Sequence, residues 1–480
     1  QQVRQLINGR GGVLNISGMA GLGKSRLMAE LKDSELLGNV ALFEGRAVSN
    51  GQNLSFHPIT QIIRSWAGIR EKDTSQDAKA KLYRSISRIH PEANDEIFPF
   101  IATMMGLRLE GKALDRISGI EGDALENLIL KNMRDLLSKA ASMRPFVIVI
   151  EDAHWCDPSS IIVLEALFKL VRKNRILYIN VYRPGYKETG ERLESFLQEE
   201  IPDHFNTINI DSLSVEQSDE LIDNLLLHTT LPDDIKKLVI DRASGNPFFI
   251  EEVIRSFIDE GLIEAGDRQF KLTENIQYAN IPESIDHVLL SRIDRLDDIT
   301  RNLLRTASVI GRNFYFKILQ EATETIEELD NRLEYLKDIQ LLNERKHKDE
   351  VEFLFKHALA QQATYESILE TSRKDLHLKI ANSIEKVFAG RIHEFYGMLA
   401  HHYSKAGKMD KTEEYLIKAG DESMMSGASS VATNFFIEAR QLIQQRNNKQ
   451  DQQKIIDLDE KLAYTTSVMW QPVETIKYCD

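Results

Sequence analysis

The feature that most constrains the fold of this chain lies near its start, where an apolar run, a glycine-rich loop and a helical pattern follow one another. Residues 13–17 have the composition of a buried strand, and the motif Gly18-x4-Gly23-Lys24-Ser25 follows them directly. The glycines of this motif, with Gly21 between them, permit backbone conformations that let successive N–H groups converge on a phosphate. The next helix would point its N-terminus at the same anion. The stretch therefore predicts a strand, a phosphate-binding loop and a helix.

The last side chains of the motif indicate what the loop would hold. Lys24 would pair with the β- and γ-phosphates of a nucleotide, and the Ser25 hydroxyl could bind Mg²⁺. The alternative is a flexible glycine loop that only caps a helix. The apolar strand before the loop and the amphipathic helix after it argue against that alternative. We therefore expect a site for ATP or ADP with Mg²⁺.

A second apolar run ends in two acids. Residues 146–150 form a continuous apolar stretch, which is typical of a parallel strand covered on both faces, and Glu151 and Asp152 follow it. Ligands of open α/β sheets bind at the carboxyl ends of the strands, so these acids could hold Mg²⁺ or orient an attacking water. The sequence leaves the division of the two roles open. An acidic strand end that faces solvent is the alternative.

A third apolar run, at 176–182, ends at Arg183. An arginine at this edge could contact a γ-phosphate, whereas the alternative is a solvated side chain at an ordinary turn. His154 could serve as a catalytic base, but no nucleophile or metal cluster accompanies it, and we favour a packing role. Residues 207–210 predict a short last strand of the sheet.

The pattern along the chain predicts four parts. They are an α/β phosphate-loop core at 1–211, a helical lid at 212–281, a winged-helix-like domain at 282–365 and tetratricopeptide-like helical repeats, cut at their end, at 366–480. Gly245-Asn246-Pro247 interrupts the lid as a helix stop and restart, and 351–355 reads as a strand. The third part holds sixteen acidic against twelve basic residues, so we expect no DNA binding there.

Composition narrows the class of protein. The net charge of −14 argues against an open nucleic-acid-binding surface. Cys156 and Cys479 are too few for a disulfide framework, and the chain has neither a signal-peptide pattern nor an apolar run near the ~20 residues of a membrane span. We expect a cytoplasmic protein. Residues 1–8 read as a helix already under way, which suggests a piece of a longer protein.

Together these motifs resemble the STAND class of signal-transduction ATPases within the AAA+ group, as found beside class III adenylate/guanylate cyclases, protein kinases or transcription regulators. The resemblance covers nearly the whole chain. The segments that carry it are 18–27, 150–157, 182–184, 244–252, 307–312 and 355–358.

The resemblance implies further roles for single residues. In that family the proline that matches Pro247 packs near the adenine, and the arginine that matches Arg183 lies at the sensor strand. Arg26, in the matched loop, is counted with the nucleotide-binding residues, and His357 loosely matches a histidine that lies near the phosphates in some members. The family's Val-Gly-Arg-Glu stretch ahead of the first helix is missing here, so the adenine contacts upstream of the loop are unaccounted for. No arginine can be assigned as a finger from a neighbouring subunit, which implies slow hydrolysis.

Two functions follow from the sequence. The first is a regulatory switch in which ATP and ADP favour different arrangements of lid and winged helix, and the difference is passed to a fused output domain. We expect nucleotide-dependent self-association, and protein partners at the repeats. The second is a steadily turning ATPase or phosphotransferase. A transcription regulator would need a DNA-binding domain outside this segment.

Overall fold

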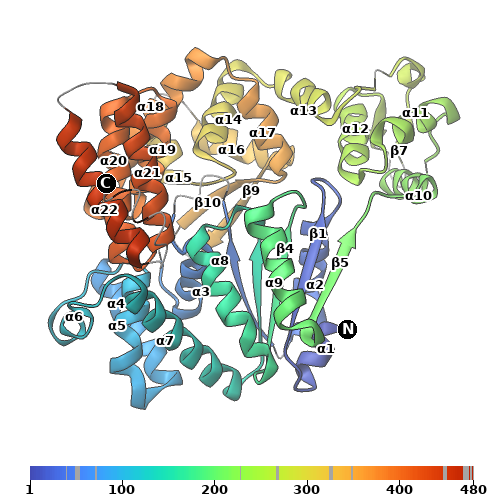
Figure 1. Cartoon of the computed structure of the whole chain (residues 1–480). Coiled ribbons are helices and arrows are strands. Elements are labelled where there is room, and N and C mark those ends of the chain that lie inside the picture. The colour runs from blue at the N-terminus through green and yellow to red at the C-terminus, as the bar shows by residue number, and fades with distance from the viewer. Residues whose placement is uncertain are drawn as a thin grey trace.

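A five-stranded parallel sheet, in the order β2-β3-β4-β1-β5, forms the centre of the computed structural model (Figure 1). Its strands are β1 Gly12–Gly18, β2 Ala41–Arg46, β3 Phe146–Glu151, β4 Ile176–Tyr182 and β5 Phe205–Ile210. The structure describes all residues except 39, 49–53, 71–72, 228, 266–269, 280, 324–327, 348–349, 447–450, 469–474, 476–477 and 479–480. The predicted parallel core is confirmed, and all five strands end at the same edge of the sheet.

Burial accounts for the composition of the strands. β1, β3 and β4 are buried along their whole length, as continuous apolar runs require in a covered parallel sheet. β5 alternates between half-buried and exposed residues because it is an edge strand that pairs only with β1, with Gly18 opposite Ile210.

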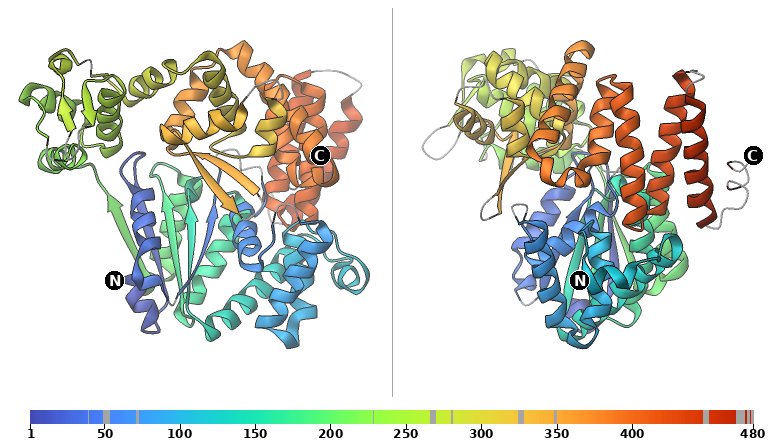
Figure 2. Two further views of the ribbon diagram at one scale, coloured as in Figure 1. Left: turned by 180° about the vertical axis from the view of Figure 1, so that it is seen from behind. Right: turned by 90° about the vertical axis from the view of Figure 1, so that its left-hand side faces the viewer.

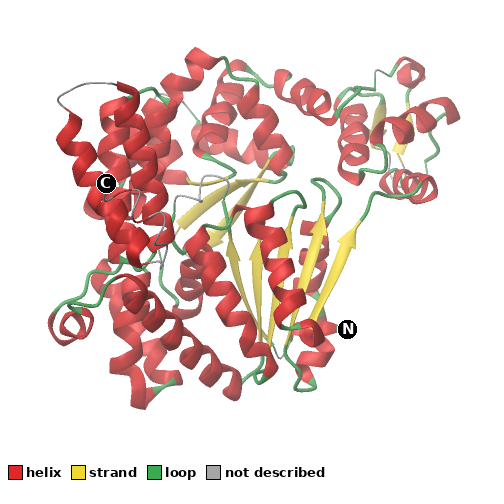
Figure 3. Ribbon diagram, in the orientation of Figure 1, coloured by secondary structure: helices red, strands yellow, loops and turns green. Residues whose placement is uncertain are grey.

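Helices cover both faces of the sheet (Figure 3). On one face Val147 and Val149 of β3 join the cluster formed with α1 and α2, and on the other face Ile148 and Ile150 join the main core. The helices of this part are α1 Gln2–Ile7, α2 Lys24–Asp33, η1 Glu35–Leu37, α3 His57–Ala67, α4 Ser75–Ile89, η3 Pro91–Ala93, α5 Asn94–Met104, α6 Gly111–Ile117, α7 Gly122–Met143, η4 Ala153–Trp155, α8 Pro158–Phe168, η5 Lys169–Arg172, η6 Lys187–Glu191, α9 Arg192–Glu200 and η7 Pro202–His204.

The segment around Pro99, ambiguous in the sequence, is helical. Helix α5 runs through Pro99, and most of its residues are buried. The burial of apolar side chains on both sides of this proline outweighs the hydrogen bond that its missing N–H cannot make.

The region predicted to be a lid forms a small unit beyond the C-terminal end of β5 (Figure 1). It consists of α10 Val215–Leu225, α11 Asp233–Ala243, α12 Pro247–Asp259, β6 Ile263–Ala265, β7 Phe270–Leu272 and η8 Glu274–Tyr278. It has an apolar core of its own, in which Ile222, Val239 and Phe257 are fully buried.

The third part combines helices with a three-stranded antiparallel sheet in the order β8-β10-β9. Its elements are α13 Ile285–Asp294, α14 Asp298–Ile310, β8 Asn313–Tyr315, α15 Phe316–Ala322, α16 Leu329–Asp338, β9 Leu342–His347, β10 Glu350–Phe355 and α17 Ala358–Glu366. The strand predicted at 351–355 is β10. The winged-helix interpretation and the four domain boundaries stay predictions.

The C-terminal part is helical, and each helix packs on the next (Figure 2). The helices are α18 Glu370–Val387, η9 Ala389–Phe395, α19 Tyr396–Lys405, α20 Met409–Met425, α21 Ser429–Arg446 and α22 Gln452–Val468. This array lies against the core: Arg108 pairs with Glu422 at 2.6 Å, and the Tyr464 hydroxyl donates to Glu121 at 2.7 Å.

The two cysteines and the question of membrane-spanning helices were also raised by the sequence. Cys156 is a buried free thiol, and Cys479 lies outside the described residues. No helix in the described part of the chain is long and apolar enough to cross a bilayer.

Candidate functional site

The glycine loop between β1 and α2 is shaped as an anion cradle. Gly21 and Gly23 have φ of +85° and +95°, in the left-handed region that glycine adopts at little cost. The backbone N–H groups of residues 20–23 donate to no described residue, and the first N–H groups of α2 have no partner within the helix. A cluster of unpaired N–H groups at a helix N-terminus fits a phosphate.

Gly18 corrects one sequence prediction. It is the last residue of β1, and its φ is not in the left-handed region. A Cβ at this position would lie 2.8 Å from the Ile210 carbonyl oxygen. Gly18 is therefore required by the close approach of β5 and not by an unusual backbone conformation.

Lys24 is buried at the bottom of the loop, with 9% of its surface exposed. Its Nζ donates to the carbonyl oxygens of Gly18 and Met19 at 2.6 and 2.7 Å. Burial, followed by the nearby Arg183, lowers the pKa of Lys24 to about 8, although Asp152 acts in the opposite direction. The ammonium group therefore lies where a further anion would stabilise it.

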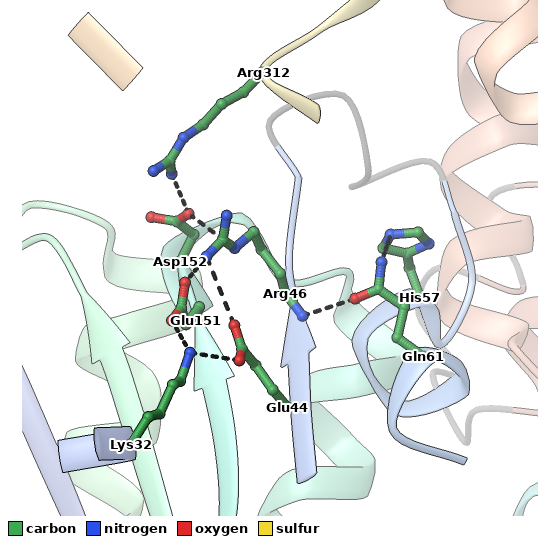
Figure 4. A network of polar contacts seen from close by, with 8 residues as sticks. All are labelled: Lys32, Glu44, Arg46, His57, Gln61, Glu151, Asp152 and Arg312. Atoms are coloured by element: carbon green, nitrogen blue, oxygen red, sulfur yellow. Dashed lines mark hydrogen bonds and ion pairs between the residues drawn. The ribbon is translucent and has the colours of Figure 1, made fainter. Parts of the chain in front are cut away.

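The two acids after β3 have different surroundings (Figure 4). Glu151 is buried and pairs with Arg46 and, at 3.3 Å, with Lys32. Glu44 of β2 completes this group, because Lys32 also binds it at 2.5 Å. Both Glu151 oxygens are thus engaged by cations on the side of the sheet where α2 lies.

Asp152 has different partners. Its backbone adopts a left-handed φ of 54°, and its Oδ2 accepts from Arg312 and lies 3.9 Å from the Nε of Arg46. Burial alone raises the pKa of Asp152, but the Arg312 and Arg46 guanidinium groups outweigh it and hold that pKa below its usual value. Asp152 therefore carries its negative charge within electrostatic reach of Lys24.

Arg183, directly after β4, belongs to the same cluster. Burial lowers its pKa, Asp152 raises it, and Arg312 lowers it. The structure thus brings Lys24, Asp152 and Arg183 together at one edge of the sheet. Arg26 points elsewhere: its side chain is 72% exposed and lies 3.9 Å from Glu251 of α12. Ser25 is exposed at the start of α2.

Residues 1–179 match an AAA ATPase domain. Residues 214–270 match a family described as a domain of unknown function. An uncharacterized protein of Rhizobium meliloti is 24% identical over 452 residues, and the chain spans 40% of the length of this curated relative.

Solved structures add distant likenesses. A STAND protein with a tetratricopeptide repeat sensor from Pyrococcus horikoshii is 14% identical, with all of this chain and 63% of that chain covered and a TM-score of 0.46. The ORC2 protein of Aeropyrum pernix, in ADPNP–ADP complexes, is 13% identical over 81% of this chain and 92% of its own, with a TM-score of 0.31. Both scores are too low to define the arrangement of the parts after the AAA domain.

The lid contacts the loop of the AAA domain through Asn246. This residue caps α12, since its Oδ1 accepts from the N–H groups of Phe248 and Phe249, and its Nδ2 donates to the Ala20 carbonyl oxygen at 3.1 Å. A Cβ on Gly21 would lie 2.5 Å from Asn246 Oδ1. Pro247, the first residue of α12, is fixed beside this contact, and its predicted role at an adenine stays a prediction.

His357 lies against the lid. Its ring stacks on Phe248 with centroids 3.8 Å apart, and burial together with Lys356 lowers its pKa to about 3. The side chain is thus neutral, and it packs on Phe248 of α12 from the N-terminal end of α17. Its predicted place near the phosphates stays a prediction.

His154 is buried between aromatic rings. Its centroid lies 5.1 Å from that of Trp155 and 4.8 Å from that of Tyr186, and burial lowers its pKa to about 3. A neutral imidazole enclosed by two rings fits the packing role favoured from the sequence.

Sequence reasoning missed several residues of the cluster. Arg46 ends β2 at the same sheet edge as Asp152, so a parallel sheet order would have pointed to it. No local sequence pattern points to Lys32, because it pairs with Glu151 only when α2 packs on the sheet. Arg312 lay in a segment that carried the family resemblance, but nothing in the sequence placed it on Asp152.

Proposed function

We propose that this chain is an ATP-binding regulatory module that switches between ATP- and ADP-bound arrangements. One observation carries the proposal: residues from three parts of the chain meet at the sheet edge where the loop lies. Lys24 belongs to the AAA domain, Asn246 caps the lid helix and touches Ala20, and Arg312 from beyond α14 pairs with Asp152. A ligand in this loop would therefore influence the position of both later parts.

The residues present fit a nucleotide and its metal. The N–H groups of residues 20–23 and Lys24 would hold the phosphates, and Ser25 and Asp152 would hold Mg²⁺. Mg²⁺ would supply charge neutralisation at the phosphate oxygens. Cations engage both oxygens of Glu151, whereas Arg312 and Arg46 approach Asp152 only at Oδ2, so we assign the metal-facing role to Asp152 and a supporting role to Glu151. Arg183 would contact the terminal phosphate and so distinguish ATP from ADP.

We propose that the switch acts on an output domain fused to this segment. We propose, from the resemblance alone, a fused class III nucleotidyl cyclase, with a protein kinase or a transcription regulator as alternatives. The C-terminal array would bind protein partners, and the bound nucleotide would control self-association. The compartment we propose is the cytoplasm.

Turnover separates this switch from the second candidate, a steadily working ATPase. Phosphate release by the purified chain, measured under saturating Mg–ATP, should be far slower than about 1 per second, which is the lower range of phosphotransfer enzymes. Sedimentation with ATP and with ADP should give different mass distributions. Turnover at or above that rate, with the same mass distribution in both nucleotides, would replace the switch by the working ATPase.

A further inference from the structure

Among the described residues, Arg312 is the one whose side chain pairs the third part with Asp152, the acid within electrostatic reach of Lys24. It stands between Gly311, the cap of α14, and β8, and its Nη1 donates to Asp152 Oδ2. Both side chains are 17% exposed, and 160 residues separate them in the sequence. The short strand β8 and the end of α14 are thus anchored at the AAA domain through one ion pair.

The cluster around this pair carries an excess of positive charge. Its cations are Lys24, Lys32, Arg46, Arg183 and Arg312, and its carboxylates are those of Glu44, Glu151 and Asp152. Five positive and three negative groups leave a balance of +2. The Arg312 guanidinium contributes to the lowered pKa values of both Lys24 and Arg183, so all three cations share one field. A polyanion would complete this cluster.

We propose that Arg312 competes with the metal of the bound nucleotide for Asp152. The proposal rests on the proposed function of the site. A divalent cation on Asp152 would repel a guanidinium held against the same carboxylate, so metal binding would weaken the Arg312–Asp152 pair. Arg312 is a positioning residue that couples metal–nucleotide binding to docking of the third part.

Other arginines of the cluster do not meet this requirement. Arg46 is held by Glu151 and Glu44 as well as by Asp152. Arg183 follows β4 within the core and makes no ion pair within 4 Å among the described residues. Neither residue can report where the third part lies, because both belong to the sheet.

The test measures how much Mg²⁺ the chain needs to bind a fluorescent ADP analogue tightly. Arg312→Gln should lower the Mg²⁺ concentration at half-effect by about ten-fold, within the usual range of coupling between sites. Arg295→Gln is the matched control, since Arg295 pairs with Glu260 at 2.5 Å away from the loop and should leave the Mg²⁺ midpoint at the wild-type value. An unchanged midpoint in Arg312→Gln overturns the inference.

A second experiment tests the competition in a different background, so the result does not depend on the folding of Arg312→Gln alone. Asp152→Asn removes the carboxylate that Arg312 and the metal would share. In this background Arg312→Gln should change the Mg²⁺ midpoint less than two-fold. A ten-fold change there would overturn the proposed competition for Asp152. Hydrogen exchange gives a readout without activity: Mg–ADP should speed exchange at 313–315 in the wild type, and unchanged exchange argues against coupling. If the wild type binds no nucleotide, the proposed function itself fails, which is a different result.

Discussion

Asn246 and Ala20 join the lid to the phosphate loop: the Asn246 amide donates to the Ala20 carbonyl oxygen at 3.1 Å while the same side chain caps α12. One side chain thus performs two tasks, and its amide nitrogen and its oxygen divide them. The division can be tested, because aspartate keeps the capping oxygen and lacks the amide donor.

Asn246→Ala should lower the free energy of unfolding by about 1 kcal/mol, the usual cost of a lost helix cap. Asn246→Asp should keep most of that stability, since the carboxylate still caps α12. It should nevertheless weaken nucleotide binding more than alanine does, because a negative charge beside the loop repels phosphates. Urea denaturation and nucleotide titration measure the two effects. Equal nucleotide affinities in both variants would show that the side chain does not face the ligand.

The lowered pKa of Lys24 predicts proton uptake on nucleotide binding. The pKa of this group is about 8 in the folded protein, below the ordinary lysine value of 10.5, and the phosphates of a nucleotide would raise it. Near pH 8.5 the free site is mostly deprotonated, so binding should take up a fraction of one proton. Calorimetry in buffers of different ionisation enthalpy measures this number, and Lys24→Met should remove it.

The lowered pKa of Lys24 also predicts how the stability of the nucleotide-free protein changes with pH. Between pH 8 and 10.5 the unfolded chain binds more protons at Lys24 than the folded chain does, so the contribution of this group to stability rises with pH across that window. The difference between wild type and Lys24→Met in urea denaturation should follow that direction. A difference independent of pH would contradict the lowered pKa.

Replacing Arg46 should lower the free energy of unfolding much more when Glu151 is present than when Glu151 is also replaced. Both side chains are buried, and Arg46→Met leaves the Glu151 carboxylate with Lys32 as its partner at 3.3 Å. Loss of one partner of a buried ion pair costs about 3–5 kcal/mol. The double variant Arg46→Met/Glu151→Met should cost clearly less than the sum of the single changes. Additive losses in urea denaturation would mean that the pair is not coupled.

Gly427 should be needed for close packing of the C-terminal helices on α7 of the core. Its φ is +81°, and a Cβ there would lie 2.8 Å from Ile129 of α7. Gly407 has a φ of +70° with no atom within 4 Å of such a Cβ, so it is a matched control for backbone strain alone. Gly427→Leu should destabilise the protein by about 1–3 kcal/mol more than Gly407→Leu, the range for overpacking. It should also speed hydrogen exchange in α7; equal effects of both variants would argue against tight docking.

How much of this site the sequence could predict depends on whether the signal is local. The loop, the two acids after β3 and Arg183 each stand beside an apolar strand, and parallel strands bring their carboxyl ends together. Gly18 was assigned the wrong reason, because the approach of Ile210 to it is a tertiary fact. Arg312 reaches Asp152 from 160 residues away, and Asn246 reaches the loop from 226 residues away, so only the packing of whole parts reveals them.

The two acids after β3 show that even adjacent residues can have surroundings that the sequence does not predict. Adjacent residues in the sequence, Glu151 and Asp152 are separated in environment by a left-handed backbone at Asp152, which turns one carboxylate toward Lys32 and the other toward Arg312. No sequence pattern states that turn. The difference in their surroundings therefore became visible only in the structure.

The most direct measurement is calorimetric titration of Mg–ATP and Mg–ADP into the wild-type chain and into Lys24→Ala. The wild type should bind one nucleotide per chain, and the variant should lose at least a hundred-fold in affinity, since a buried charged partner of the phosphates contributes about 3 kcal/mol or more. Wild-type affinity in Lys24→Ala, in a variant that unfolds with the wild-type transition, would contradict the claim that this loop is the nucleotide site.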